Sequence, residues 1–275
     1  MAEHFTQPPH WDWWITFYFY IAGLAGGSYV LATILRARGS SRDEATARVG
    51  YMLAFPLVVV CAILLTVDLG QPMRFYHMLV NTTPGVGGLN FKPWSPISLG
   101  SWGLLIFGLF AFISFLESRG MLKALPIAFT AIGSLFGLFL CAYTGVVLSV
   151  SNQPIWSDSW AIGALFVASA LSASAALLAS FSRSDDTDGS TGTRLMRADR
   201  HFVVLELVAL AIFFVTLAMA GTLGKTLNGI WLVLWILVLA SMVPPLLGRH
   251  RGLVAIGVLA GVLLMRIAVI FSAQS

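Results

Sequence analysis

Hydrophobic residues occur along this chain in long runs, separated by short segments that carry most of the polar residues. Each long run is apolar on nearly every face of a helix, and its length of about 20 residues is enough to cross the hydrocarbon core of a bilayer. The pattern predicts an all-α integral membrane protein with eight transmembrane helices, at approximately 14–35, 49–69, 96–117, 124–148, 159–181, 201–222, 227–247 and 251–272.

The composition supports this fold class. Of the 275 residues, 58% are hydrophobic and 10% are charged, whereas a soluble domain carries roughly 25% charged residues. We therefore expect one membrane domain over residues 1–275, placed in the cell membrane, with lipid around it and no nucleic-acid partner. The first residues lack a basic segment followed by a small-residue cleavage site, so we expect no signal peptide.

The distribution of basic residues predicts the orientation. Cytoplasmic loops of membrane proteins are enriched in Lys and Arg. Of the 16 Lys and Arg residues, 12 follow the first, third, fifth and seventh runs, three lie on the opposite side, and Arg266 lies within a run. This bias places both termini outside the cytoplasm. It also places the segment 70–95 outside, where its aromatic residues, glycines and prolines predict an ordered, packed excursion, and makes 182–200 a polar cytoplasmic linker.

Few ionisable groups lie inside the predicted spans, and each is costly there. A charge at the bilayer centre costs at least about 2.5–3.5 kcal/mol, so such residues tend to face a bundle interior and to mark a pathway. Asp68, Tyr143 and Arg266 share a depth near the outer face on three different helices, and they could converge on one polar pocket. The alternatives are that Asp68 pairs with Arg74 and that Arg266 only extends to the interface.

Two further features bear on a site. Glu206 lies about five residues into its span from the cytoplasm, which suggests a role in proton movement. Gly23, Gly26 and Gly27 lie in the middle of the first span. Close helix packing explains such glycines well, and the alternative is that they leave room for a flat ligand.

The histidines and cysteines argue against a metal cofactor in this chain. A haem held by two histidines needs both of them inside the bundle, and all five histidines lie in tails, loops or helix ends. Cys61 and Cys141 lie in apolar runs without the spacing of an iron–sulfur or zinc site. We expect no haem, no iron–sulfur cluster, no other metal and no disulfide.

Four stretches of the sequence form a recognisable series. They are "YIAGLAGGSYVLA" after an aromatic entry, "DLGQPMRFYHML", "FKPWSPISLGSW", and "YTGVVLSVSNQPIW" with the following "LFVASALSASAALL". In their order and spacing over roughly residues 11–180, they resemble the polysulfide reductase membrane-subunit family (NrfD/PsrC-like). The last three spans match this family only as hydrophobic helices.

The resemblance implies a fold of two four-helix bundles and a quinone site near the outer face, for menaquinone or ubiquinone. It also implies assembly with a four-cluster ferredoxin-like iron–sulfur subunit and a molybdopterin catalytic subunit, as in anaerobic respiration. The chain would then exchange electrons between the quinone pool and the iron–sulfur subunit. It would be the quinone-binding part of an oxidoreductase and would hold no catalytic residue or metal of its own.

Residue by residue, the resemblance makes Tyr143 a quinone contact and places Asp68 near the same pocket. Polar residues that some family members carry in the first span, including Asn and His, are replaced here within "FYFYIAGLAGG". With the residues singled out above, the predicted sets are as follows. The quinone set is Tyr143, Asp68, Arg266, Gly23 and Gly27, the proton set is Asp68, His77 and Glu206, and the partner-docking set is Arg74, Phe75, Lys92 and Trp94.

Two other functions stay open from the sequence. A structural anchor would use the outer segment to dock a redox partner and would need neither Tyr143 nor Asp68. A proton or ion transporter would explain eight spans with a few buried charges, and it predicts inverted repeats and broken helices. The terminal substrate belongs to the catalytic subunit, so polysulfide, thiosulfate, tetrathionate, formate, arsenate and nitrite all remain candidates.

Overall fold

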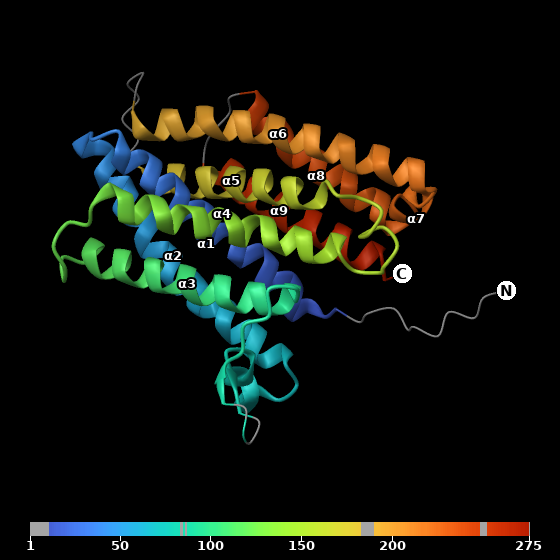
Figure 1. Cartoon of the computed structure of the whole chain (residues 1–275). Coiled ribbons are helices and arrows are strands. Elements are labelled where there is room, and N and C mark those ends of the chain that lie inside the picture. Colours follow the sequence, from blue (N-terminus) through green and yellow to red (C-terminus); the bar gives the residue numbers. More distant parts are fainter. Residues whose placement is uncertain (1–10, 83–84, 86, 183–189, 248–251, 275) are drawn as a thin grey trace.

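The computed structural model describes residues 11–82, 85, 87–182, 190–247 and 252–274. Within them the fold is almost entirely helical, which confirms the predicted class (Figure 1). Seven helices are long and apolar enough to cross a membrane, and α8 is a shorter apolar helix. These eight are α1 (Trp13–Ala37), α2 (Ser41–Asp68), α3 (Pro96–Ser118), α4 (Ile127–Ser149), α5 (Ile162–Phe181), α6 (Thr191–Ala220), α8 (Ile230–Leu246) and α9 (Gly252–Ser272).

The eight helices form two four-helix bundles. Helix α1 packs on α2 and α4, and α3 packs between α2 and α4, which closes the first bundle. Helices α5, α6, α8 and α9 form the second bundle, with α7 (Leu223–Thr226) as a short turn before α8. Contacts of α5 with α1 and α4 join the two bundles. Most of α1 and α5 is therefore buried, whereas α2, α3 and α6 expose most of their surfaces, as lipid-facing helices do.

Helices α2 and α6 begin earlier than the hydrophobic pattern predicts. The prediction started these spans at 49 and 201, but the helices start at Ser41 and Thr191. The linker predicted at 182–200 is thus wrong for its second half, while its residues 183–189 lie outside the described part. Ser190 caps α6, because its hydroxyl accepts a hydrogen bond from the Thr193 amide at 3.2 Å.

Ion pairs explain why these polar turns are helical. We call the side of the bundles where α2 and α6 begin the arginine-rich end, and the other side the opposite end. Asp43 in the first turn of α2 is fully buried and accepts hydrogen bonds from Thr191 (2.7 Å) and Arg194 (3.0 Å) of α6. Arg36 of α1 bonds both Glu44 of α2 (2.9 Å) and Glu117 of α3 (3.0 Å). These pairs fasten helices of both bundles together at the arginine-rich end.

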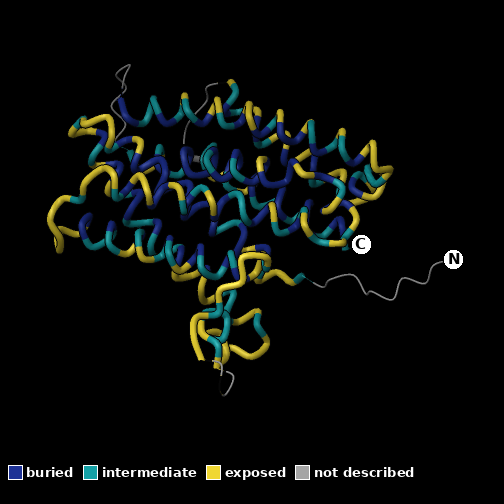
Figure 2. The backbone as a smooth tube through the Cα atoms, viewed as in Figure 1, coloured by how far each residue is buried: buried dark blue, intermediate teal, exposed yellow. Residues whose placement is uncertain are grey.

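The segment 70–95 projects from the bundles at the end of α2, as Figure 1 shows. Gly70 adopts a positive φ of 66°, which ends α2 and turns the chain into the 3₁₀-helix η1 (Pro72–Met78). Strands β1 (Val80–Asn81) and β2 (Gly88–Leu89) then pair as a small antiparallel hairpin. We call residues 70–95 the projection. Its described residues form a short helix and a hairpin, as an ordered segment would, but none of them is buried, so they are packed less closely than predicted (Figure 2).

At the opposite end, the segment between α4 and α5 anchors the second bundle. Trp156 is fully buried and its indole N–H donates to the Val269 carbonyl of α9 at 2.9 Å. Gln274, just beyond α9, accepts a hydrogen bond from the Trp11 amide at 2.8 Å. The start of α1 and the end of α9 are therefore held side by side at the opposite end.

Candidate functional site

Tyr143 lies on α4, about 9 Å before its end by helix rise, and faces the first turn of α3. Its hydroxyl donates a hydrogen bond to the Pro96 carbonyl at 2.8 Å, and its ring stacks on Phe139 at 5.7 Å. The ring fills the space that Gly100 leaves by having no side chain, since a Cβ there would lie 2.2 Å from the hydroxyl oxygen. The tyrosine is half-buried, with its polar group at the α3–α4 contact.

The buried Tyr18 of α1 lies close to both Tyr143 and Cys61. The Cys61 thiol points at the Tyr18 carbonyl, with sulfur and oxygen 3.9 Å apart. Tyr18 is a residue that sequence analysis did not single out, because an aromatic residue in an apolar run gives no signal of its own. It adds a second phenol near Tyr143.

Arg266 is enclosed inside the protein, although an arginine in a span often extends to the interface. It is 1% exposed, and its guanidinium donates to the Ser169 hydroxyl (3.0 Å) and the Phe166 carbonyl (3.2 Å) of α5. It also lies over the Phe166 ring, 4.4 Å from the centroid. Hydrogen bonds to protein groups and a cation–π contact therefore stabilise this charge.

Helix α6 carries two buried carboxyl groups, and one of them, Glu206, lies near Arg266. Glu206 and Asp199 are each 1% exposed and close enough to interact electrostatically with each other, and Glu206 interacts with Arg266 in the same way. The Ser172 hydroxyl donates to Asp199 Oδ1 at 2.6 Å. Glu206 Oε1 and Asp199 Oδ2 have no hydrogen-bond partner among the described residues. We call Asp199, Glu206 and Arg266 the buried charge row.

The buried charge row changes the sequence prediction in two ways. Because α6 starts at Thr191, Glu206 lies at the midpoint of the helix, where the prediction placed it five residues from its start. Asp199 was missed, because in the sequence it stands among arginines and resembles part of a solvated loop.

Asp68, Tyr143 and Arg266 do not share one hydrogen-bonded cluster. Asp68 is exposed at the last residue of α2, near Asp12, and it forms no ion pair with Arg74 within the described residues. Cys141, two residues before Tyr143, points its thiol toward the Gly23 carbonyl at 3.5 Å on the side of Arg266. Two residues span about 200° of a helix, so Tyr143 and Arg266 lie on different sides of α4.

The glycines of α1 lie at close helix contacts. A Cβ at Gly27 would lie 2.4 Å from the Ser174 hydroxyl oxygen, and one at Gly23 would lie 3.1 Å from Ala170 Cβ. A Cβ at Gly26 would lie 2.5 Å from the Gly137 carbonyl oxygen. The space that the missing side chains leave is thus occupied by α4 and α5.

The residues predicted to dock a partner lie on or beside the projection. Arg74, His77 and Lys92 line a polar cavity of about 310 Å³ at its base, with Ser95 and Ser98 from the start of α3. Phe75 is half exposed, and Trp94 is 79% exposed. The projection therefore presents both basic and aromatic side chains.

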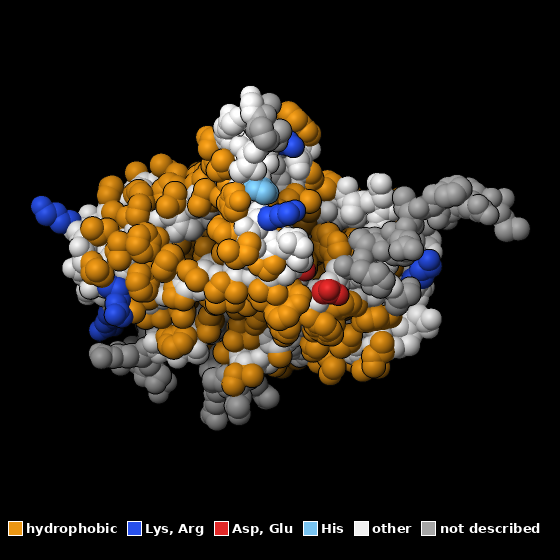
Figure 3. Space-filling model, turned by 90° about the horizontal axis from the view of Figure 1, so that it is seen from below, with side chains coloured by type: hydrophobic (Ala, Val, Ile, Leu, Met, Phe, Trp, Pro, Cys, Tyr) orange, Lys and Arg blue, Asp and Glu red, His pale blue; other side chains and the backbone are white. Residues whose placement is uncertain are grey.

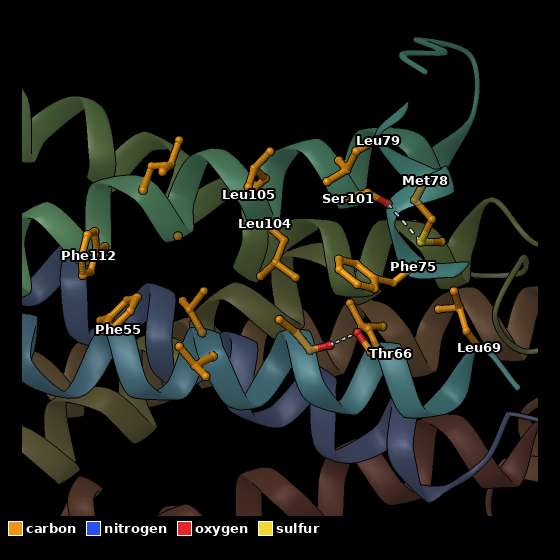
Figure 4. A pocket seen from close by; sticks show the side chains of 16 residues that line it. Phe55, Thr66, Leu69, Phe75, Met78, Leu79, Ser101, Leu104, Leu105 and Phe112 are labelled. Carbon is orange, nitrogen blue, oxygen red and sulfur yellow. Dashed lines mark hydrogen bonds between the residues drawn. The ribbon is translucent and has the colours of Figure 1, made fainter. Parts of the chain in front are cut away.

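An apolar groove of about 460 Å³ runs between α2 and α3 beside that cavity (Figure 4). Phe55 and Phe112 lie at one end, and Leu69, Phe75 and Met78 lie at the other. In the described residues, no group of three or more His, Cys, Asp and Glu is placed to hold a metal ion, and both cysteines are free and buried. The groove and the polar cavity both include residues of the projection, among them Met78.

The fold and its buried polar groups define a multi-span membrane protein of two four-helix bundles with a few enclosed charges and a projecting segment at one side. A family model described as polysulfide reductase, of the NrfD type, matches residues 5–275. The protein therefore belongs to the polysulfide reductase (NrfD) family, which confirms the resemblance drawn from the sequence and makes it a membrane subunit of an oxidoreductase complex.

Two relatives carry names that describe one component of a reductase. The C chain of polysulfide reductase from Wolinella succinogenes is 25% identical over 303 aligned residues, which cover 96% of this protein and 94% of the relative. The C subunit of selenate reductase from Mesobacillus selenatarsenatis is 34% identical over 79 residues. That match covers 29% of this protein and spans only 18% of the length of the selenate reductase component.

Proposed function

We propose that this protein is the quinone-reactive membrane subunit of an iron–sulfur/molybdopterin oxidoreductase in the cytoplasmic membrane. It would exchange electrons between the membrane quinone pool and an extracytoplasmic iron–sulfur subunit. The observation that carries the proposal is the family match over residues 5–275, supported by the similarity to the polysulfide reductase C chain, which aligns over nearly its whole length. The partners we propose are a four-cluster ferredoxin-like subunit and a molybdopterin catalytic subunit.

Tyr143 fits the role of a hydrogen-bond donor to a quinone carbonyl. A bound menaquinone or ubiquinone would supply two-electron, two-proton chemistry. The ring of Tyr143 is held by Phe139 and Gly100, so its position is fixed, and its hydroxyl is a single directed donor. Turning the hydroxyl hydrogen from Pro96 to a quinone oxygen exchanges one hydrogen bond for another, each contributing about 0.5–1.5 kcal/mol net.

The titratable groups suggest where protons would move. Asp68 is exposed at the end of α2 and His77 lies at the polar cavity, so both can exchange protons with water on the projection side. Glu206 and Asp199 are buried carboxyl groups along α6 that could relay protons through the second bundle. Arg266 lies close enough to Glu206 for the two groups to interact electrostatically.

The projection would dock the iron–sulfur partner. Arg74 and Lys92 supply positive charge, while Phe75 and Trp94 supply exposed aromatic area of the kind enriched at protein interfaces. Electrostatic attraction of this kind mainly speeds association and orients the partner.

Turnover of the Tyr143→Phe variant in the assembled complex tests the quinone site. Deleting the hydroxyl keeps the ring packing. Because a bond to the quinone would replace the bond to Pro96, we expect quinone affinity to fall by less than the about 0.5–1.5 kcal/mol of one hydrogen bond, and turnover to fall further, because the bond tightens as charge develops. Tyr29→Phe is the matched control, because it removes a buried hydroxyl that bonds Ser114 at 2.8 Å in the same bundle. Wild-type quinone kinetics in a Tyr143→Phe complex that still binds its iron–sulfur partner would exclude this site.

A structural anchor without a quinone site is the second candidate. It is favoured by one observation, the hydrogen bond that Tyr143 already donates to the Pro96 carbonyl. In that case Tyr143→Phe would lower stability and leave quinone kinetics unchanged. A transporter is disfavoured, because each described spanning helix runs without a break at its midpoint.

A further inference from the structure

The apolar groove and the polar cavity form one continuous site, with an apolar part and a polar part. Leu69, Met78 and Ser101 line both, so the two hollows share a border at the base of the projection. The Ser101 hydroxyl lies 3.8 Å from the Met78 sulfur at that border, as the dashed line in Figure 4 shows. A molecule with an apolar part and a polar part would fit across it.

The groove suits a hydrocarbon chain. It extends along α2 from Phe55 to Leu69, which is about 21 Å by helix rise. Its lining is aliphatic and aromatic apart from two hydroxyls, and these are already bonded within their own helices, Thr66 to Ala62 (2.7 Å) and Ser101 to Ile97 (2.8 Å). The lining therefore favours a part of a ligand that has no polar groups.

The polar cavity suits an anion. Arg74, His77 and Lys92 line it, no acidic side chain does, and none of these three forms an ion pair in the described part of the protein. The N-terminal turn of the 23-residue helix α3 contributes Ser95, Ile97 and Ser98 to the same lining. The positive end of that helix dipole adds to the attraction for negative charge.

We propose that the groove and the cavity together bind an anionic glycerophospholipid. Its phosphate lies among Arg74, His77 and Lys92, and one acyl chain lies along the groove between α2 and α3. The cavity stands where α2 ends and α3 begins, the level at which lipid headgroups meet the ends of spanning helices. Arginine and lysine side chains are the usual protein ligands of phosphate groups.

A quinone fits this composite site less well than a phospholipid does. Arg74 and Lys92 are exposed to solvent, and an uncharged quinone ring would form no ion pair with them, whereas a phosphate group would. The face of the molecule seen in Figure 3 is mainly hydrophobic. On it a histidine lies beside a basic side chain, and acidic side chains lie farther from the projection. The proposal is separate from the quinone site at Tyr143, which lines neither hollow.

The bound lipid would fasten the projection to the bundle. Phe75, Met78 and Leu79 of η1 and its end line the groove together with side chains of α2 and α3. An acyl chain there would give the otherwise exposed projection an apolar contact on its bundle side. The lipid would thereby fix the orientation of the surface that we propose for docking the iron–sulfur partner.

Native mass spectrometry of the full-length protein from mixed phosphatidylglycerol and phosphatidylcholine nanodiscs tests the proposal. We expect one phosphatidylglycerol retained per protein molecule, in preference to phosphatidylcholine. Replacing Arg74→Gln and Lys92→Gln should weaken retention about fivefold each, because each basic residue near anionic lipid contributes about that factor. The Lys225→Gln control removes an exposed cation of α7 that lines neither hollow, and it should leave retention unchanged.

The groove is tested separately from the charges. Ala62→Phe places a ring in the groove from an exposed position of α2, and it should lower retention, whereas Ala211→Phe at an exposed position of α6 should not. Equal retention of both lipids by the wild-type protein would overturn the proposal, as would wild-type retention by the doubly substituted Arg74→Gln, Lys92→Gln protein. Displacement of the phosphatidylglycerol by added menaquinone would also overturn it and would assign the groove to a quinone tail.

Discussion

Buried charge is the feature of single residues that most distinguishes this protein. Arg266 and Glu206 are both enclosed, yet no ion pair joins them in the described structure, because their interaction acts over a longer distance. The guanidinium depends instead on Ser169 and the Phe166 carbonyl. Burying a guanidinium costs free energy. Removing it afterwards also costs free energy, because its acceptors are left without a hydrogen-bond donor.

Removing the charge of Arg266 should therefore destabilise the second bundle. We expect Arg266→Gln to lower the free energy of unfolding by about 1–3 kcal/mol, the cost of leaving a buried hydrogen-bond acceptor without its donor. Thermal unfolding in detergent, followed by tryptophan fluorescence, measures the change. The matched substitution Lys225→Gln on the exposed turn α7 should have almost no effect, and an equal effect of the two would contradict this account.

The carboxyl groups of the buried charge row make a prediction about proton movement. Glu206→Gln keeps the shape and removes the titrating group, so we expect proton uptake by vesicles containing the complex to fall while quinone affinity stays unchanged. Asp199→Asn should act in the same direction, because Asp199 lies near Glu206 on the same helix. If both variants take up protons at the wild-type rate, the two carboxyl groups have a structural role only.

Sequence rules found some of these residues and missed others for a physical reason. Glu206 and Arg266 stand out because they interrupt long apolar runs. Asp43 and Asp199 are as deeply buried, but their sequence neighbours are charged, and local polarity cannot show that a distant arginine or serine encloses them. The contact of Tyr143 with Pro96 depends on how α3 and α4 face each other, which periodicity does not determine.

At the scale of the helices, packing depends on where glycine stands. A Cβ at Gly27 of α1 would lie 2.8 Å from the Ala170 carbonyl oxygen of α5, a backbone atom that cannot turn aside. Gly257 of α9 has nothing within 4 Å of the same position. Both are glycines inside spanning helices, so they form a matched pair that separates helix propensity from packing.

We expect Gly27→Ala to destabilise the protein by about 1–3 kcal/mol, the cost of overpacking a close contact. Gly257→Ala should be neutral or stabilising by up to about 1 kcal/mol, because alanine favours the helix and meets no neighbour there. Unfolding of both variants in one detergent compares them directly. Loss of stability at Gly257 equal to that at Gly27 would show that close packing does not explain the glycines of α1.

The ends of helices were harder to predict than their existence. The apolar cores of all eight spans were found, since an uninterrupted run of about 20 apolar residues is typical of a membrane-spanning helix. The polar first turns of α2 and α6 were predicted as loops. They are helical because Asp43 of α2 pairs with Arg194 of α6, and local sequence does not show this contact. The projection was predicted to be packed, yet none of its described residues is buried, and Met73 is 85% exposed.

At the scale of the whole molecule, α1 and α5 connect the two bundles. The family resemblance implied two four-helix bundles, and the structure agrees, with α1 contacting α5 and α9 as well as its own bundle. Hydrophobicity alone could not give this arrangement, because each span is apolar on all faces and does not show which neighbour it meets. The orientation of the bundles in the membrane stays a prediction that rests on the arginine count.

Cysteine labelling in intact cells tests that orientation. Met73 lies on the projection, predicted to be outside, and is 85% exposed. Met121 lies between α3 and α4, predicted to be cytoplasmic, and is 69% exposed. The native Cys61 and Cys141 are buried and should give little background labelling. If the basic loops are cytoplasmic, an impermeant maleimide should label Met73→Cys from outside and leave Met121→Cys unlabelled until the cells are opened. The opposite pattern would reverse the topology. It would then place the projection, and with it the proposed docking surface for an extracytoplasmic iron–sulfur subunit, on the cytoplasmic side, where such a subunit could not reach it.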